Sequence, residues 1–170
     1  MISAGDQVNK TGEAKEEEYA SYLSADALKG LAVATTIGNH DSLNEDYMYH
    51  FNNPNNTENG KTQAGGDYYY SYGEGLFVVL NTNNYNVAEH QKTIEEAVKA
   101  YPDAKWRIVT IHQDIYGSGL DHSDTDGMIF VHSLHLYLMQ MILMWFFRDT
   151  IIHTAVPKCF MVTDRLMVNM

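Results

Sequence analysis

The segment LAVATTIGNHD (residues 31–41) joins an apolar run directly to a cluster of polar residues. Leu31–Ile37 has the aliphatic and β-branched content of a buried strand, and Gly38 marks its end. An asparagine, a histidine and an aspartate follow at once. Enzymes built from alternating strands and helices place their chemistry at such strand ends. The segment therefore predicts a buried strand with a candidate functional loop at its carboxyl end.

The rest of the first 128 residues alternates between helix and strand patterns. Predicted strands cover residues 2–4, 31–37, 68–72, 76–81 and 106–111, and predicted helices cover 13–28 and 87–100. The glycines at 73 and 75 separate two of these strands and indicate a hairpin. Residues 52–67 are rich in Asn, Gly and Thr, which is typical of an exposed loop. The alternation indicates an α/β fold.

Two further strand ends carry polar residues of the same kind. Asp6 follows Gly5 after a short apolar run, and His112 follows the last predicted strand. Taken singly, Asp6 and Asn39 are more often turn or cap residues, and a histidine such as His112 is more often a hydrogen-bonded structural residue. Together, carboxylate, amide and imidazole groups suit a divalent metal ion. Gly5 and Gly38 would allow the sharp turns that expose these side chains.

Three motifs occur in the order Gly5-Asp6, Gly38-Asn39-His40-Asp41 and Val109-Thr110-Ile111-His112. In that order they resemble the second, third and fourth sequence blocks of the calcineurin-like metallophosphoesterases, and among these the bacterial relatives of purple acid phosphatases. The resemblance covers residues 1 to about 128, and the block around Asn39 is the most specific. It implies an α/β fold, a two-sheet β-sandwich flanked by helices, here lacking its first strand and its C-terminal portion.

The resemblance also implies a role for each matching residue. Asp6 would bridge two metal ions, and Asn39 and His112 would hold the second of them. His40 would contact the substrate phosphate or protonate the leaving oxygen, and Asp41 would orient His40. Two neighbouring metal ions polarise a phosphate ester and activate the attacking water. The implied cofactors are two divalent or trivalent ions of iron, manganese or zinc.

The loop after His112 holds further candidates for substrate binding. Tyr116 and His122 lie in this loop, beside Asp121 and Asp124. For any one of these residues, a solvated polar loop is the commoner explanation. As a group, they predict a wall of the substrate pocket.

The chain is acidic, with a formal net charge of -11. A surface of that sign repels nucleic-acid backbones and anionic membranes, whereas a positive metal cluster still binds a small phosphate ester. We therefore expect a small-molecule phosphate ester as the substrate, no nucleic-acid partner and no membrane association. Residues 1–6 do not form a secretory signal, so the protein is expected to be intracellular, or secreted or cell-surface if its true N-terminus is missing.

Two sequence blocks of the family are missing from the chain. No Asp-x-His precedes Asp6, and no Gly-His-x-His follows His112. In the family these blocks complete the first metal site and supply the remaining histidine of the second. The prediction is thus a phosphoesterase whose activity is doubtful in this form. The alternative is a non-catalytic remnant or metal-binding module with a hydrophobic C-terminal segment.

The composition changes near residue 128. All twelve glycines lie at or before Gly127, and seven of the nine methionines lie at or after Met128. We interpret residues 1–128 as a partial phosphoesterase domain and 129–170 as an aberrant hydrophobic tail. The apolar part of the tail approaches the roughly 20 residues that span a bilayer. A transmembrane helix is nevertheless the weaker alternative, because histidine, serine and glutamine residues interrupt it.

A shifted reading frame accounts for the tail. When the third base of each codon is joined to the first two of the next, the genetic code forces Ala at Met139-Gln140, Asp at Met141-Ile142 and Val-Val at Met144-Trp145-Phe146. Codons for residues 148–152 then permit Gly-His-Asn-His. This hidden sequence is a strand that leads into the missing block. We therefore expect residues 129–170 to be a frameshifted translation.

Overall fold

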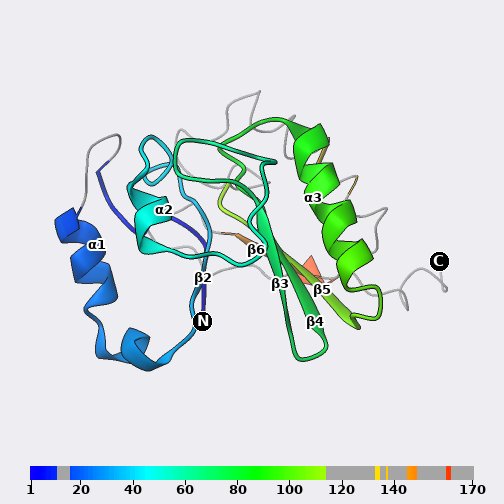
Figure 1. Cartoon of the computed structure of the whole chain (residues 1–170), viewed down its shortest axis with the longest axis horizontal. Helices are drawn as coiled ribbons and strands as arrows, with labels where there is room; N and C mark the ends of the chain where they lie inside the picture. Colours follow the sequence, from blue (N-terminus) through cyan, green and yellow to red (C-terminus); the bar gives the residue numbers. More distant parts are fainter. Residues whose placement is uncertain (11–15, 114–132, 135–136, 138–144, 149–159, 162–170) are drawn as a thin grey trace.

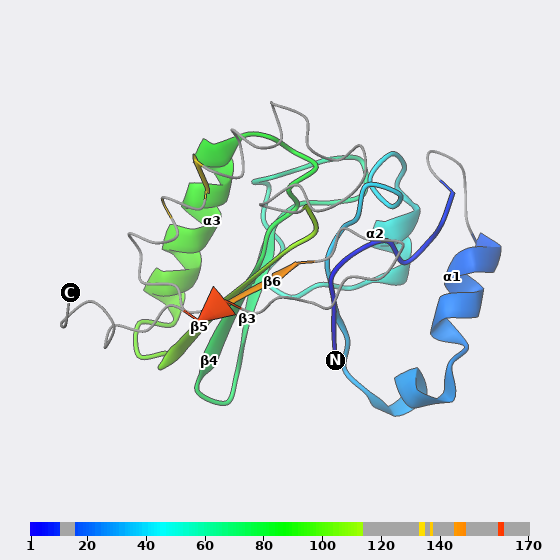
Figure 2. The ribbon, with the colours of Figure 1, turned by 180° about the vertical axis from the view of Figure 1, so that it is seen from behind.

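The structure is a computed structural model and describes residues 1–10, 16–113, 133–134, 137, 145–148 and 160–161. It contains a sheet of two strands and a sheet of five strands. Helices α1 and α2 lie on the side of the small sheet, and α3 packs along the large sheet (Figure 1). The view from behind shows the same separation (Figure 2). The expected α/β class with two sheets is confirmed.

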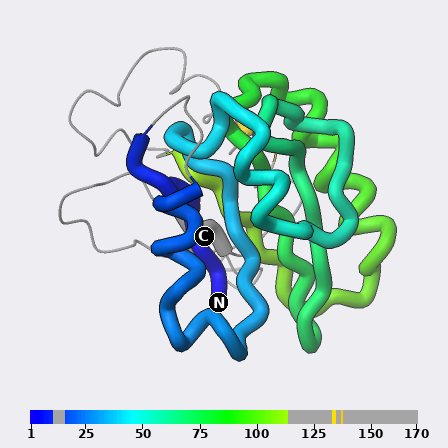
Figure 3. Tube along the Cα trace, turned by 60° about the vertical axis from the view of Figure 1, so that its left-hand side comes forward, coloured from blue at the N-terminus to red at the C-terminus, as the bar shows by residue number. Residues whose placement is uncertain are grey.

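The small sheet consists of β1 (Ile2–Ser3) and β2 (Ala34–Thr35), which run parallel. Figure 3 shows the N-terminal segment lying beside the segment that contains β2. Because both strands point the same way, the loops that follow them leave from the same edge of the sheet. The predicted strand at residues 31–37 is shorter in the structure, since only Ala34 and Thr35 pair with β1.

Short helices accompany the small sheet. They are α1 (Glu16–Leu23), the 3-10 helix η1 (Asp26–Gly30) and α2 (Asp46–His50). The predicted helix at 13–28 therefore divides into α1 and η1. Three glutamates in the first turn of α1 favour the helix because negative charge complements the positive end of the helix dipole. The sequence did not predict α2, which is too short to show a periodic apolar pattern.

The large sheet has the strand order β3-β4-β5-β6-β7. The strands are β3 (Tyr68–Tyr72), β4 (Gly75–Val79), β5 (Trp106–Ile111), β6 (Trp145–Arg148) and β7 (Phe160–Met161). β3 and β4 form the predicted hairpin, and the φ of 59° at Gly73 suits the first central position of a type II′ turn. β4, β5 and β6 run parallel, and β7 is antiparallel to β6.

Helix α3 (Val87–Ala100) connects β4 to β5 and covers the large sheet. Its bounds and those of β5 agree with the prediction. Ile94 and Ala97 of the helix are fully buried and pack against aliphatic side chains of the sheet. The resulting aliphatic core consists of Leu76, Val78, Leu80, Ile94, Ala97, Val109, Ile111 and Leu134. This core fixes the parallel pair β4 and β5, and hence the edge at which His112 emerges.

A second core lies among α1, α2 and the loops that follow β1 and β2, and it contains aromatic side chains. It consists of Val8, Tyr19, Ile37, Tyr47 and Ala64, with Phe51 packed against it. Two buried tyrosines satisfy their hydroxyl groups on the backbone of β2: the hydroxyls of Tyr47 and Tyr68 donate to the carbonyl oxygen of Thr35 at 3.0 and 2.7 Å. Since Tyr68 belongs to β3, its bond also joins the two sheets.

The boundary at residue 128 and most of the tail lie outside the described residues. The described part of the tail includes β6, which continues the sheet beyond β5 with Ile111 opposite Arg148. None of the helices that the structure describes is long and apolar enough to cross a membrane. The transmembrane alternative for the tail falls largely on residues outside this description.

Candidate functional site

Three loops meet at the carboxyl ends of β1, β2 and β5 and bring the predicted ligands together. His112 Nε2 lies 2.9 Å from Asn39 Oδ1 and 3.5 Å from Asp6 Oδ2. His40 Nε2 lies 4.0 Å from the same oxygen of Asp6. Asp6 and His112 are more than one hundred positions apart in the chain. The structure nevertheless brings the four side chains together at the ends of these strands.

The junction between the sheets is held by backbone as well as by side chains. His112 donates from Nδ1 to the carbonyl oxygen of Ala4 at 2.9 Å, which ties the end of β5 to the end of β1. The amide of His40 donates to Asp6 Oδ1 at 3.0 Å and so orients that carboxylate. The side chain of Asp6 is therefore placed by the loop that carries Asn39.

Glycine is required at both predicted positions because other chain segments approach them closely. A Cβ atom on Gly5 would stand 2.3 Å from His112 Nδ1, and one on Gly38 would stand 2.2 Å from the backbone nitrogen of Asp6. Asp6 itself has a φ of 51°, in the left-handed region that non-glycine residues seldom adopt. Unfavourable backbone conformations of this kind concentrate at functional sites, where the surrounding contacts hold them in place.

The donor atoms fit a divalent cation. Because the Ala4 carbonyl can only accept, Nδ1 of His112 carries a proton, and when the ring is neutral the lone pair of Nε2 faces the oxygens of Asn39 and Asp6. Three electron-donating atoms that face one another are satisfied together by a metal ion placed between them. A histidine whose other nitrogen is bound to a carbonyl is the usual form of a metal ligand.

The set is nevertheless smaller than a complete two-metal centre. In the part of the chain that the structure describes, no group of three or more His, Cys, Asp or Glu side chains is placed to hold a metal ion. The candidate site reaches three donors only by counting the amide oxygen of Asn39.

Asp41 is buried directly behind the site. Its carboxylate accepts hydrogen bonds from the backbone amides of Gly38 and Gln7, at 2.9 and 3.4 Å, and from the hydroxyl of Tyr19 at 3.0 Å. Burial raises the pKa of Asp41 to about 6, although these three bonds act in the opposite direction. Asp41 thus links the loop after β1 to the loop after β2. Its predicted role in orienting His40 stays a prediction.

A group of uncharged polar side chains beside the site was not predicted. Gln113 donates to the side-chain oxygen of Asn83, and Asn83 in turn donates to the carbonyl oxygen of Gly38. Four of the residues at 81–84 and 86 are asparagines, and in the sequence this composition indicates only a turn. In the sequence, only the position of Gln113 next to His112 indicates that one of these two residues lies near the site. The predicted substrate-binding residues Tyr116 and His122 lie outside the described residues.

Comparison with known proteins identifies the family. A family model described as calcineurin-like phosphoesterase matches residues 1–138, which include all three motifs and the whole candidate site. No curated protein and no solved structure gave a significant match. Since the matched region covers most of the 170 residues, the chain belongs to the calcineurin-like phosphoesterase family.

Proposed function

We propose that this domain binds divalent metal ions and hydrolyses phosphate mono- or diesters of small molecules. The observation that carries the proposal is the convergence of Asp6 Oδ2 and Asn39 Oδ1 on His112 Nε2, which lies 3.5 Å from the carboxylate oxygen and 2.9 Å from the amide oxygen. Membership of a phosphoesterase family gives this donor set its chemical context. The two-metal form of the reaction, with iron, manganese or zinc, is part of the proposal.

The chain's own residues would divide the work. Asp6, Asn39 and His112 would hold the metal ions, which neutralise the phosphate and activate water when bound. His40 lies beside Asp6 with its side chain 22% exposed, so it is accessible to a bound ester. Its imidazole would bind a phosphate oxygen or protonate the leaving oxygen. Asp41 would hold the loop that carries both Asn39 and His40.

The charge of the chain favours a small substrate. A net charge of -11 repels nucleic-acid backbones, so only an ester small enough to lie within the field of the metal ions would bind well. This argument supports small phosphate esters and no nucleic-acid partner.

The test measures bound metal and hydrolysis of an aryl phosphate in the same preparations. Asp6→Ala should remove both bound metal and turnover. Asp26→Ala is the matched control, since the side chain of Asp26 is 94% exposed and lies in η1, and it should leave both unchanged. Turnover that survives Asp6→Ala would contradict the proposal.

A second candidate function is metal binding without catalysis. The small donor set of the described residues favours it. It predicts that the parent chain binds metal, that Asp6→Ala abolishes this binding, and that neither protein hydrolyses the ester. Turnover by the parent chain would exclude this candidate.

We also propose that residues 129–170 are translated from a shifted reading frame. Parallel pairing of β6 with β5 supports this, because Arg148 stands opposite Ile111, the residue before His112. The shifted frame permits Gly-His-Asn-His over codons 148–152, directly after that strand. Sequencing of the genomic locus tests the proposal: codons that forbid this block in the shifted frame would end it. A protein made in the restored frame should bind more metal per chain than the present one.

A further inference from the structure

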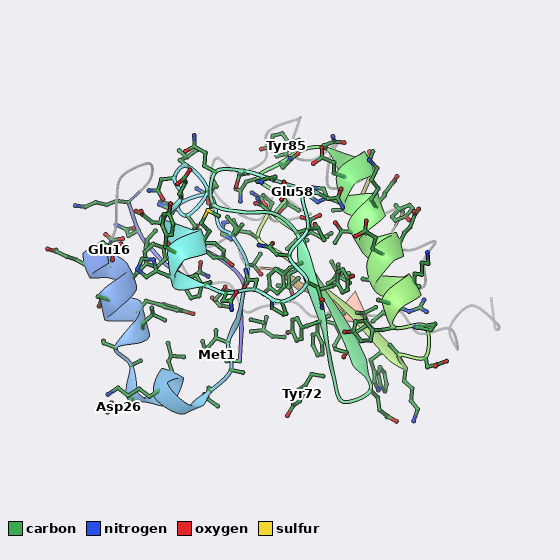
Figure 4. The ribbon with its side chains drawn as sticks, in the orientation of Figure 1. Met1, Glu16, Asp26, Glu58, Tyr72 and Tyr85 are labelled. Carbon is green, nitrogen blue, oxygen red and sulfur yellow. The ribbon has the colours of Figure 1, made fainter. Side chains whose placement is uncertain are left out.

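The turn between β4 and α3 lies beside the candidate site. β4 and β5 are parallel, so the residues after β4 and the residues after β5 emerge at the same edge of the sheet. Asn83 follows β4, and His112 follows β5. Tyr85, two residues beyond Asn83, is labelled at the end of the molecule where α3 begins (Figure 4). The turn is thus well placed to contact the loops that carry the ligands.

Asn83 joins two of those loops through a single side-chain amide. Its Nδ2 donates to the carbonyl oxygens of Ile37 and Gly38, at 2.9 and 3.3 Å. Its Oδ1 accepts from Nε2 of Gln113 at 2.9 Å. Ile37 and Gly38 immediately precede Asn39, and Gln113 immediately follows His112. One side of the amide therefore holds the backbone that leads to Asn39, and the other side holds the neighbour of His112.

The amide of Asn83 is itself fixed to the buried part of the domain. Its Nδ2 also donates to Oδ1 of Asn81 at 2.9 Å. Asn81 is only 2% exposed, and its own Nδ2 donates to the carbonyl oxygens of Gly60 and Gly65 at 2.9 and 3.1 Å. Its backbone amide donates to the buried carboxylate of Asp67 at 2.8 Å. Asn81 consequently holds Asn83 in place, while Asn83 contacts the loops that follow β2 and β5.

We propose that Asn83 is a positioning residue that sets the separation between Asn39 and His112. The proposal rests on the proposed function, since it takes these two residues as metal ligands. Asn39 Oδ1 and His112 Nε2 are only 2.9 Å apart, so a small displacement of either loop changes the geometry of the donor pair. Asn83 is not a ligand in this view, because its two polar groups already contact Ile37, Gly38, Asn81 and Gln113.

The role requires a donor and an acceptor on the same side chain. An aspartate has the same shape as asparagine but cannot donate to the carbonyls of Ile37 and Gly38, which it would repel. Asn83→Asp should therefore release the loop that carries Asn39. It also adds a negative charge near the site, which by itself would strengthen cation binding. A loss of metal affinity in this variant could therefore not be explained by the added charge, which acts in the opposite direction.

The first measurement is the dissociation constant for Mn²⁺, determined by calorimetry on the full chain. Asn83→Asp should weaken binding by about 10- to 100-fold, the usual effect of removing a contact behind a metal ligand. Asn86→Asp is the matched control, because it makes the same chemical change at an exposed residue whose side chain donates only to Glu89 at 2.8 Å. It should change the constant by less than about twofold.

A double-mutant cycle tests whether Asn83 acts through its neighbour. Gln113→Leu removes the partner of Asn83 Oδ1 without touching the carbonyls of Ile37 and Gly38. If Asn83 couples the two loops, the loss of affinity in the double variant should be smaller than the sum of the two single losses. Additive losses would show that the two residues act separately and would overturn the proposed coupling.

The second measurement needs no metal. Amide hydrogen exchange of residues 37–41 in the metal-free chain should be faster in Asn83→Asp and unchanged in Asn86→Asp, while the unfolding temperature stays close to that of the parent. Unchanged exchange would overturn the positioning role, and so would exchange that rises equally throughout the chain. If the parent chain binds no metal, the proposed function fails, and the exchange experiment still decides whether Asn83 positions the loop.

Discussion

The two cores of the domain differ in how they are held together. The core between α3 and the large sheet is made of leucine, valine, isoleucine and alanine side chains that are fully buried. The core beside the small sheet contains aromatic rings, and the two strands of that sheet are only two residues long. Here the hydroxyl of Tyr47 is bonded to the backbone of β2, and the carboxylate of Asp41 is bonded to the hydroxyl of Tyr19 and to the backbone amide of Gly38. The first region thus depends on buried apolar area, and the second on individual hydrogen bonds.

This difference explains where the candidate site lies. An aliphatic core gives a rigid edge from which His112 emerges, but it offers few polar groups. The small sheet supplies polar loops, which are placed by directed bonds such as those of Asp41. A site at the junction combines a rigid support with several donor atoms. The comparison predicts that mutations in the two regions have different consequences, and the following experiments test it.

His90 should give the largest effect, because it is a buried titratable residue on the helix that covers the apolar region. His90 and Asp67 are fully buried, with Nδ1 2.8 Å from Oδ2, and Nε2 donates to the carbonyl of Asn84 at 2.8 Å. Both ring nitrogens therefore face acceptors, as in an imidazolium ion. At a pH below the pKa of the folded state, His90→Gln would leave the carboxylate without its cation and should cost about 4 kcal/mol in the free energy of unfolding.

The pH dependence of this effect is a sharper test. Burial lowers the pKa of His90, but the hydrogen bond and the charge of Asp67 outweigh it, so the pKa is raised above 6.5. The stability from the pair is then complete below pH 6.5 and is lost as the pH rises through the higher pKa of the folded state. Urea unfolding should show a gap between parent and His90→Gln that narrows at alkaline pH. Thr93→Val removes another hydrogen bond to Asp67, at 3.0 Å. The difference in unfolding free energy between the parent and this variant should stay constant with pH.

Leu76→Ala tests the aliphatic region directly. Leu76 lies in β4 with no exposed surface, and its truncation leaves a cavity between the sheet and α3. We expect a loss of about 3 kcal/mol in the free energy of unfolding. Leu31→Ala is the control, because Leu31 is 52% exposed, and it should have little effect. Equal losses in the two variants would refute the assignment of the core.

Gly38→Ala tests the close contact on which the polar region depends. The added Cβ would meet the backbone nitrogen of Asp6 at 2.2 Å, so one of the two loops must move. We expect the free energy of unfolding to fall by about 2 kcal/mol. Metal binding should also weaken, because the displaced residue is a candidate ligand. Gly30→Ala is the control, since nothing lies within 4 Å of its Cβ position. A Gly38→Ala protein with normal stability and metal binding would contradict the observed packing.

Tyr68→Phe should give the smallest effect, because it removes one bond between the two regions. The hydroxyl of Tyr68 donates to the carbonyl of Thr35 at 2.7 Å and is buried. Loss of this hydrogen bond should lower the free energy of unfolding by about 1 kcal/mol. Tyr72→Phe makes the same change in the same strand, where the side chain is 80% exposed and extends from the end of the hairpin (Figure 4). The unfolding temperature of this control should equal that of the parent chain.

The sequence predicted the elements of the aliphatic region well. α3 and β5 agree residue by residue with their patterns, because continuous apolar runs and helical periodicity report burial directly. The small sheet was harder to delimit. The apolar run at 31–37 suggests a long strand, but β1 provides partners only for Ala34 and Thr35. Pairing between distant segments is not encoded in the pattern of either segment.

The site was predicted through its motifs, and its supporting contacts were not. Asp6, Asn39 and His112 follow strand ends and are therefore visible in the sequence. Asn83 stands in a run of asparagines, where the residue type indicates a turn and not a particular partner. Its contact with Gln113 arises only once β4 and β5 are placed side by side. Long-range contacts of this kind depend on the fold and not on local spacing.

The bond from His112 to Ala4 has a consequence for mutational tolerance. The acceptor is a main-chain oxygen, so no change of side chain at position 4 can remove it. In a saturation library, position 4 should accept many substitutions, although it contacts the candidate metal ligand His112. Insertions or deletions between β1 and Gly5 should be rejected almost without exception, because they displace that oxygen. Selection at this position therefore acts on the path of the chain and leaves the identity of the residue comparatively free.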